Sequence, residues 1–183
     1  MMKKMWVAAM LAAVGSSAMA AGGYVEASAG ISHVNQTCPE GASCKSNKPA
    51  FRVLGGFYHL NPMVNAEVGY LNFGRATGKT ATANASLQSS AIYAGLALRL
   101  PVDEDIGLTF RVGGASVTSQ LKGSAIDTAK STKTNLLLGM GGEWKIDGKL
   151  SAIAAVDMTK TADPDGGGRG SLSMVTAGVR YEF

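Results

Sequence analysis

The last ten residues, MVTAGVRYEF at 174–183, decide the fold class. One parity of this segment is apolar or aromatic and holds Val175, Ala177, Val179, Tyr181 and Phe183. The other parity is small, polar or charged and holds Thr176, Gly178, Arg180 and Glu182. Successive side chains of a β-strand point to opposite faces. The segment is therefore predicted to be a strand whose two faces meet different environments.

The same alternation recurs upstream and predicts seven more strands, at about 23–34, 50–60, 63–74, 86–100, 106–118, 134–146 and 149–160. The connections alternate in length. Long polar loops are expected at about 35–48, 75–85, 119–132 and 161–170, and tight turns such as Asp147-Gly148 lie between the others. An even number of strands, with long loops at one end and short turns at the other, is typical of outer-membrane barrels. We therefore predict an all-β fold, an eight-stranded antiparallel up-and-down transmembrane β-barrel.

The polar faces of these strands carry acids and bases in equal number. They are Glu26, Arg52, Glu67, Arg99, Arg111, Glu143, Lys145, Asp157, Arg180 and Glu182. The interior of an eight-stranded barrel is just wide enough to be filled by side chains. Charges that point inward there must be paired, because an unpaired buried charge is costly. We predict that these residues form a lumen charge network, and that glycines on the same face make room for the long side chains.

The first twenty residues, MMKKMWVAAMLAAVGSSAMA, have the pattern of a cleaved signal peptide. Lys3 and Lys4 precede a short apolar run, and Ala18-Met19-Ala20 is a small-x-small cleavage site. The mature domain is then 21–183, and its formal charge falls from +4 to +2. The basic character is thus mostly an export feature, so no nucleic-acid partner is expected. Export to an oxidising compartment favours a disulfide between Cys38 and Cys44, with a metal site as the alternative.

Three segments resemble one known family. They are GGFYHLNP at 55–62, AEVGY at 66–70 and VRYEF at 179–183. They are similar to the glycine–aromatic strand, the tight turn and Glu-containing strand, and the C-terminus of the OmpA-like transmembrane domain and opacity-protein group of Gram-negative bacteria. The resemblance implies a multi-pass barrel of the outer membrane. It also implies that Val179, Tyr181 and Phe183 form the signal read by the barrel-assembly machinery. The peptidoglycan-binding domain of full-length OmpA-type proteins is absent from this sequence, so anchoring to the cell wall is not expected.

The function favoured by these features is a non-enzymatic surface barrel. In the resembling group, adhesion, complement evasion and envelope integrity are typical roles. A surplus of basic residues in the loops could meet lipopolysaccharide phosphates, host glycans or an acidic matrix, and the alternative is solvated loops with lipid-headgroup contacts. Trp144, Tyr181 and Phe183 near the short turns are predicted to form the periplasmic aromatic girdle. The alternative for these aromatics is the core of a soluble sandwich. We expect a monomer among outer-membrane lipids, with no cofactor.

Two other functions compete. A narrow channel for small solutes is suggested by the glycine-rich interior, although paired charges in a narrow lumen favour closure. An enzyme acting on lipid A would need a positioned base beside a nucleophile. His33 and Ser32 are adjacent but face opposite ways in a strand, and His59 lies at the other end of the barrel. Asp163 and Asp165 beside a glycine run resemble a calcium loop only faintly, and a flexible turn is favoured instead.

Overall fold

The computed structural model describes residues 22–35, 43–44, 47–61, 63–79, 84–123, 129–161 and 170–183. The elements in these ranges are strands: β1 (Gly23–Asn35), β2 (Ser43–Cys44), β3 (Asn47–Asn61), β4 (Val64–Lys79), β5 (Asn84–Pro101), β6 (Ile106–Gly123), β7 (Ala129–Lys145), β8 (Leu150–Lys160) and β9 (Ser171–Glu182). Within the described ranges, no helix has the length and apolar character needed to cross a membrane.

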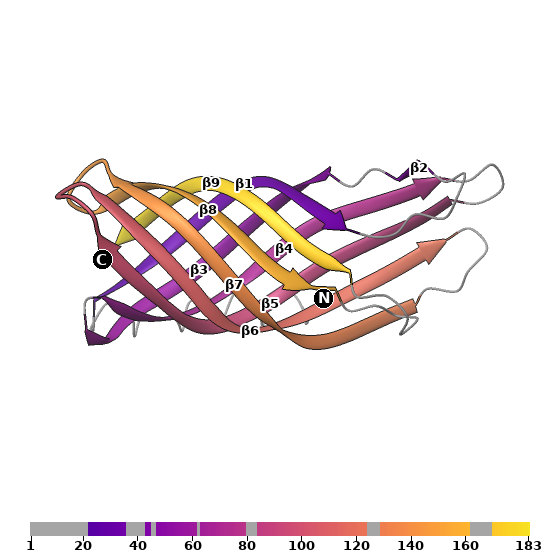
Figure 1. The fold of residues 1–183 in the computed structure, drawn as a ribbon, viewed down its shortest axis with the longest axis horizontal. Coiled ribbons are helices and arrows are strands. Elements are labelled where there is room, and N and C mark those ends of the chain that lie inside the picture. The colour runs from indigo at the N-terminus through magenta and orange to yellow at the C-terminus, as the bar shows by residue number, and fades with distance from the viewer. Residues whose placement is uncertain are drawn as a thin grey trace, which may run out of the picture.

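Eight of these strands close into one barrel. The hydrogen-bonded order is β4-β3-β1-β9-β8-β7-β6-β5, and pairing of β4 with β5 closes the ring. Every pairing is antiparallel, and chain neighbours are sheet neighbours except at β1, which also joins the last strand, β9. The two-residue β2 pairs only with the end of β4, through Ser43 and Cys44. Figure 1 shows the strands winding obliquely around a common axis. The predicted eight-stranded up-and-down barrel is confirmed.

The barrel has two different ends. At the turn end, Asn61 pairs with Val64 where β3 and β4 meet, and 102–105 and 146–149 connect the next strand pairs. The amide of Phe183 donates to the carbonyl of Gly23 at 3.0 Å. At the opposite loop end, the connections from β4 to β5 and from β6 to β7 are shorter than the sequence predicted, whereas β8 ends and β9 begins where the predicted loop 161–170 requires. Strand β4 continues to Lys79 and β5 begins at Asn84, while β6 continues to Gly123 and β7 begins at Ala129. The predicted loops 75–85 and 119–132 were therefore too long. Polar residues at the loop end pair through the backbone, and they lack the alternation of apolar side chains by which the strands were predicted.

The outer face of the barrel is an apolar belt. Outward-pointing Ile92 and Trp144 are each 64 % exposed, and Met158 is 56 % exposed. Cross-strand rows of such residues cover the wall, for example Val64–Leu98–Phe110–Met140–Val156 and Leu96–Val112–Leu138–Met158. A continuous apolar surface of this kind is unfavourable in water and suits lipid, which also requires that a sheet have no open edge.

Candidate functional site

The centre of the lumen is Glu26, a carboxylate with a side-chain exposure of 0 %. Three guanidinium groups donate to it. Arg52 Nη2 donates to Oε1, Arg111 Nη2 lies 3.0 Å from Oε2, and Arg180 Nη2 lies 3.0 Å from the same oxygen. Strand β1 places Glu26 inward, and its sheet neighbours β9 and β3 carry Arg180 directly opposite and Arg52 two residues along from its partner Leu54. Glu26 is therefore the acceptor that joins three arginines.

Each of these arginines has a further acid. Arg52 Nη1 donates to Asp157, and Arg111 Nε donates to Glu67 at 3.0 Å. Glu67 also accepts the phenol hydroxyl of Tyr24. The deep part of the lumen thus balances Glu26, Glu67 and Asp157 against Arg52, Arg111 and Arg180. Paired and hydrogen-bonded charges are the form in which ionised groups are tolerated in a buried setting.

The ion pairs continue toward the turn end. Arg180 Nη1 donates to Glu143, Arg99 Nε lies 2.5 Å from Glu143, and Arg99 Nη1 lies 2.5 Å from Glu182. Side-chain exposure rises along this path, from 1 % at Arg180 to 17 % at Arg99 and 23 % at Glu182. We call the nine residues the lumen ion network: Glu26, Arg52, Glu67, Arg99, Arg111, Glu143, Asp157, Arg180 and Glu182. Each of the eight barrel strands contributes to it, so the network ties together the whole circumference.

Aromatic rings and glycines complete this half of the lumen. The guanidinium carbon of Arg180 lies 4.5 Å from the centroid of the Tyr24 ring, a cation–π geometry. A Cβ at Gly56 would overlap the Tyr24 ring, and a Cβ at Gly139 would overlap a carboxylate oxygen of Asp157. These two glycines therefore provide the space that the buried tyrosine and the ion pair fill. Each of these glycines has the parity of a charged lumen residue on its own strand, as predicted for inward glycines, and Tyr24 has the parity of Glu26 but was not among the predicted lumen residues.

The other half of the lumen is apolar, which the sequence analysis did not predict. We call it the apolar plug: Ala50, Leu54, Leu71, Phe73, Ala91, Tyr93, Ala115, Val117, Leu137, Leu172 and Met174. These side chains are at most 4 % exposed. The signal for them was a loss of alternation near the loop end, where the run LLL at 136–138 puts an apolar side chain on both faces. The barrel is therefore filled by two layers, one ionic and one apolar.

Lys145 is a correction to the predicted network. Its parity is that of Glu143, but β7 ends at this residue and its side chain is exposed at the turn end. It therefore lies past the filled part of the lumen, where a charge needs no partner. The aromatics Trp144, Tyr181 and Phe183 lie at the same end, and the rings of the last two are 5.7 Å apart in an edge-on arrangement. Cys38, the side chain of Cys44, the segment 1–20, Asp163 and Asp165 lie outside the described residues.

The described residues do not assemble a catalytic pair around His33. Its ring nitrogen Nδ1 lies 2.9 Å from the amide oxygen of Asn47 on the outside of the barrel. Ser32 points inward and donates to the carbonyl of Phe73 at 2.5 Å. The side chain of His59 lies outside the described residues. Among the residues that are described, no group of three or more His, Cys, Asp or Glu side chains is arranged to hold a metal ion.

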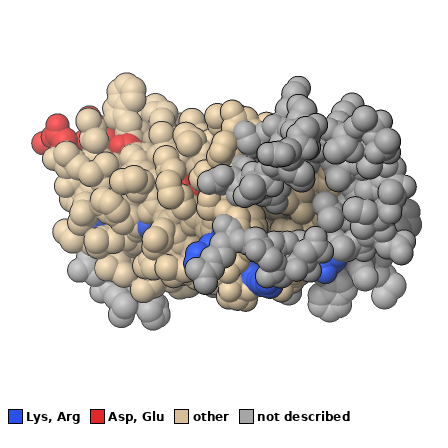
Figure 2. Space-filling view, turned by 45° about the vertical axis from the view of Figure 1, so that its right-hand side comes forward, with Lys and Arg blue, Asp and Glu red and all other residues tan. Residues whose placement is uncertain are grey.

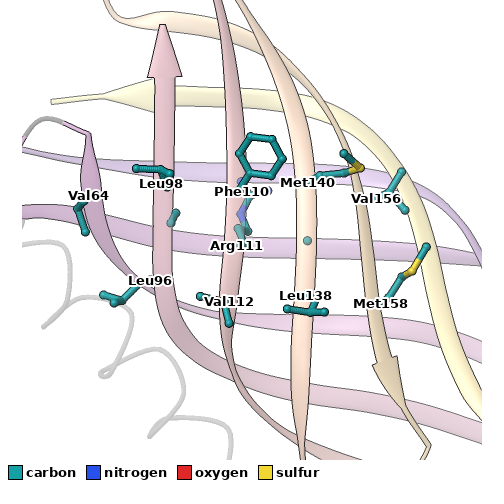
Figure 3. Close-up of a pocket in the computed structure, with 12 residues that line it drawn as sticks. Val64, Leu96, Leu98, Phe110, Arg111, Val112, Leu138, Met140, Val156 and Met158 are labelled. Carbon is teal, nitrogen blue, oxygen red and sulfur yellow. The ribbon is translucent and has the colours of Figure 1, made fainter.

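A groove with a volume of about 620 Å³ lies on the outer wall. Figure 3 shows it between two cross-strand rows, with Leu98, Phe110, Met140 and Val156 on one side and Leu96, Val112, Leu138 and Met158 on the other. Its walls are these apolar side chains, and Arg111 turns away from it into the lumen. The groove is part of the lipid-facing belt, and its almost wholly apolar lining does not form a catalytic site.

A closed eight-stranded barrel with an apolar belt outside and a filled ionic lumen inside is an integral barrel of the bacterial outer membrane. The chain belongs to the OmpA-like transmembrane domain family, whose model matches residues 18–183. Outer membrane protein A of Klebsiella pneumoniae is 24 % identical over 135 residues, and that of Klebsiella aerogenes is 25 % identical over 130 residues. Each match covers 70 % of this chain and 39 % or 37 % of the relative, so the chain spans about two fifths of the length of these relatives.

Solved structures of small outer-membrane barrels share the fold. The crystal structure of Neisserial surface protein A has a TM-score of 0.63 and 16 % identity, and the match covers 88 % of this chain and 97 % of that one. Ail, the attachment invasion locus protein of Yersinia pestis, has a TM-score of 0.60 and 14 % identity, with 89 % and 99 % covered. The protein is accordingly a multi-pass β-barrel of the outer membrane.

Proposed function

We propose that this protein is a non-conducting, non-enzymatic surface barrel. Its loop end faces the cell exterior and binds molecules at the cell surface. The observation that carries the proposal is that buried ion pairs and buried apolar side chains both occupy the described part of the lumen. Glu26 alone joins three arginines from β3, β6 and β9 at one level, and the apolar plug fills the next level. An ion that crossed the barrel would have to separate buried ion pairs and then pass between the buried apolar side chains of the plug, and both steps are unfavourable.

Planar-bilayer recording tests this proposal. Purified barrel should give no single-channel steps. Glu143→Gln weakens the ion network near the turn end but leaves the apolar plug intact, so this variant should remain silent as well. Steps in the unmodified protein that change in size with Glu67→Gln or with Arg111→Gln would identify the lumen as a conducting path and overturn the proposal in favour of the narrow channel.

The proposed orientation of the barrel is supported by the difference between its two ends. Short turns face the periplasm and longer connections face outward in bacterial barrels of this type. Trp144 is 64 % exposed and Tyr181 is 43 % exposed at the turn end, which supports an aromatic girdle at the periplasmic membrane surface. Val179, Tyr181 and Phe183 would serve as the assembly signal, and their outward parity on β9 leaves Val179 and Tyr181 accessible at the wall. Removal of residues 1–20 as a signal peptide belongs to the same proposal.

Surface interaction is supported by the structural neighbours. Ail is an attachment protein by name, and its structure is also known in complex with the heparin analogue sucrose octasulfate, with a TM-score of 0.58 and 15 % identity to this chain. Polyanionic surface molecules are therefore candidate partners for the basic loop end, together with lipopolysaccharide. Comparison of a deletion strain and its complemented parent for host-cell binding, serum survival and envelope permeability would separate adhesion from envelope integrity.

An enzymatic role is the second candidate, because the outer membrane protease OmpT of Escherichia coli shares the barrel fold at a TM-score of 0.53 and 9 % identity. Such a likeness shows the fold alone. The pair that the sequence offered is not assembled, since His33 and Ser32 lie on opposite faces of β1. An unchanged lipid A mass spectrum on overexpression, and intact peptide substrates after incubation with purified barrel, are the expected results.

A further inference from the structure

Strands β4 to β7 rise farther above the apolar belt than the other strands do. On β8 the strand ends at Lys160, two residues past the outward Met158. On β5 the last large outward apolar residue is Ile92, and the strand begins eight residues away, at Asn84. Figure 1 shows β4, β5, β6 and β7 reaching beyond the ends of β8, β9 and β1. The extension is continuous hydrogen-bonded sheet, so its side chains are held on a fixed platform.

A row of four polar residues crosses the outward face of this extension. Direct cross-strand partners link Arg75 to Gln88, Gln88 to Gln120 and Gln120 to Lys130. Arg75 Nη2 donates to the Gln88 side-chain oxygen at 3.2 Å, which fixes both on the same face. Neighbouring strands are about 4.8 Å apart, so the row spans about 14 Å. It carries a cation at each end and two amides between them.

A second row lies between the first row and the membrane. It runs Asn72–Ser90–Thr118–Thr132 through direct cross-strand partners, and the hydroxyls of Thr118 and Thr132 lie 3.0 Å apart. On β5, Ser90 and Gln88 lie two and four residues above Ile92. At about 3.3 Å per residue and a strand tilt of about 40°, they stand about 5 and 10 Å above the hydrocarbon boundary. Each polar headgroup layer of a bilayer is about 5–8 Å thick, so both rows lie at headgroup depth and just beyond it.

The charge of this end is one-sided. Within the described ranges, no Asp or Glu lies at the loop end, whereas Lys48, Arg75, Lys130, Lys133 and Lys160 do. The exposed acids of the described chain, Asp103, Glu104, Asp105 and Asp147, are in the turns at the opposite end. On the face drawn in Figure 2, most blue atoms lie toward the loop end and the most prominent red ones lie at the turn end.

We propose that the two rows on β4 to β7 form a binding site for the phosphorylated sugar headgroup of an outer-leaflet glycolipid. Arg75 and Lys130 would bind phosphate groups through charge-assisted hydrogen bonds. Gln88, Gln120 and Thr118 present the amide and hydroxyl groups that pair with sugar hydroxyls. The site faces sideways, directly above the apolar belt, so its natural occupant is a lipid that lies beside the barrel. The inference rests on the proposed function for the orientation that puts the loop end outside, and it assigns residues to the lipopolysaccharide contact named there.

Binding of purified bisphosphorylated lipopolysaccharide to the folded protein in detergent tests the site. The variant Arg75→Gln/Lys130→Gln removes both cations from the long row and should lower the affinity about tenfold or more. The matched control is Lys145→Gln/Lys149→Gln, which removes the same charge from exposed residues at the turn end and should leave the affinity unchanged. Heat-modifiable gel mobility shows that each variant is folded, since none of the four side chains enters the lumen.

Each further outcome decides one part of the proposal. An equal loss of affinity in the Lys145→Gln/Lys149→Gln control, or no loss in Arg75→Gln/Lys130→Gln, overturns the site. Equally tight binding of dephosphorylated lipopolysaccharide would contradict the phosphate-binding role of Arg75 and Lys130. Competition by glucosamine phosphate at the same concentration as the glycolipid would show that the lipid is not required and overturn the choice of ligand. Bilayer conductance tests the proposed function separately, because these substitutions do not alter the lumen.

Discussion

Substitution of Glu26 by glutamine should be the most destabilising single charge removal in the barrel. Glutamine keeps the shape of the side chain but removes the charge that three arginines share. The deep lumen would then hold Arg52, Arg111 and Arg180 against only Glu67 and Asp157. Breaking one buried ion pair costs about 3–5 kcal/mol, because the remaining charge stays buried without its partner. For Glu26 we expect a loss at the upper end of this range, about 5 kcal/mol.

A series of variants tests whether the loss of stability decreases as the exposure of the acid increases. Glu143 and Glu182 have side-chain exposures of 9 % and 23 %, compared with 0 % for Glu26. Water screens a charge pair more strongly as exposure increases, so Glu143→Gln should cost about 2–3 kcal/mol and Glu182→Gln about 1 kcal/mol. Glu104 is an exposed acid in a turn, and Glu104→Gln should leave the free energy of unfolding unchanged within error. The expected order of loss is therefore Glu26, Glu143, Glu182 and Glu104.

The assay is equilibrium urea unfolding of protein reconstituted in lipid vesicles, followed by the fluorescence of Trp144. A loss of stability in Glu26→Gln no larger than in Glu104→Gln, or a loss in Glu182→Gln as large as in Glu26→Gln, would refute the role assigned to burial of the charge pairs. A marginally stable barrel could fail to fold with Glu26→Gln, and the milder Glu143→Gln and Glu182→Gln variants still test the slope. The double variant Glu26→Gln/Arg180→Gln should lose less free energy of unfolding than the two single variants together, because it also removes one of the excess positive charges.

Three other features give testable outcomes. Gly56→Ala should cost about 1–3 kcal/mol, because its Cβ meets the ring of Tyr24, whereas Gly142→Ala on the outer wall should be nearly neutral; equal effects in urea unfolding would contradict the space-filling role. Trp144 should be quenched more strongly by lipids brominated near the glycerol than by lipids brominated at the chain ends, and the reverse order would remove it from the membrane surface. Deletion of Phe183 should reduce the heat-modifiable, folded form recovered in outer membranes but not folding in detergent, and unchanged recovery would argue against its role in the assembly signal.

Local pattern was sufficient to predict the class of fold. The alternation from Val175 to Phe183 and its repeats reflect a physical constraint, since one face of each strand must suit lipid and the other must not. The same constraint stops at the membrane surface. Above it, polar residues such as those of 84–90 pair into strands without any alternation of apolar side chains, so the predicted loops 75–85 and 119–132 were too long. The prediction for Lys145 failed for a related reason, since parity assigns a face but does not show where the filled lumen ends.

The sequence by itself determined that this protein is a membrane barrel with charges inside, because two-residue periodicity and even strand number are local and additive signals. Only the tertiary structure decided which charges meet. The pairing of Arg52 with Asp157 joins residues 105 positions apart, and that of Arg180 with Glu26 joins residues 154 positions apart. Such contacts depend on the register and closure of the whole sheet, as does the separation of the lumen into an ionic layer and an apolar plug. The polar platform on β4 to β7 likewise arises from strand length and register, which no short segment of the chain specifies.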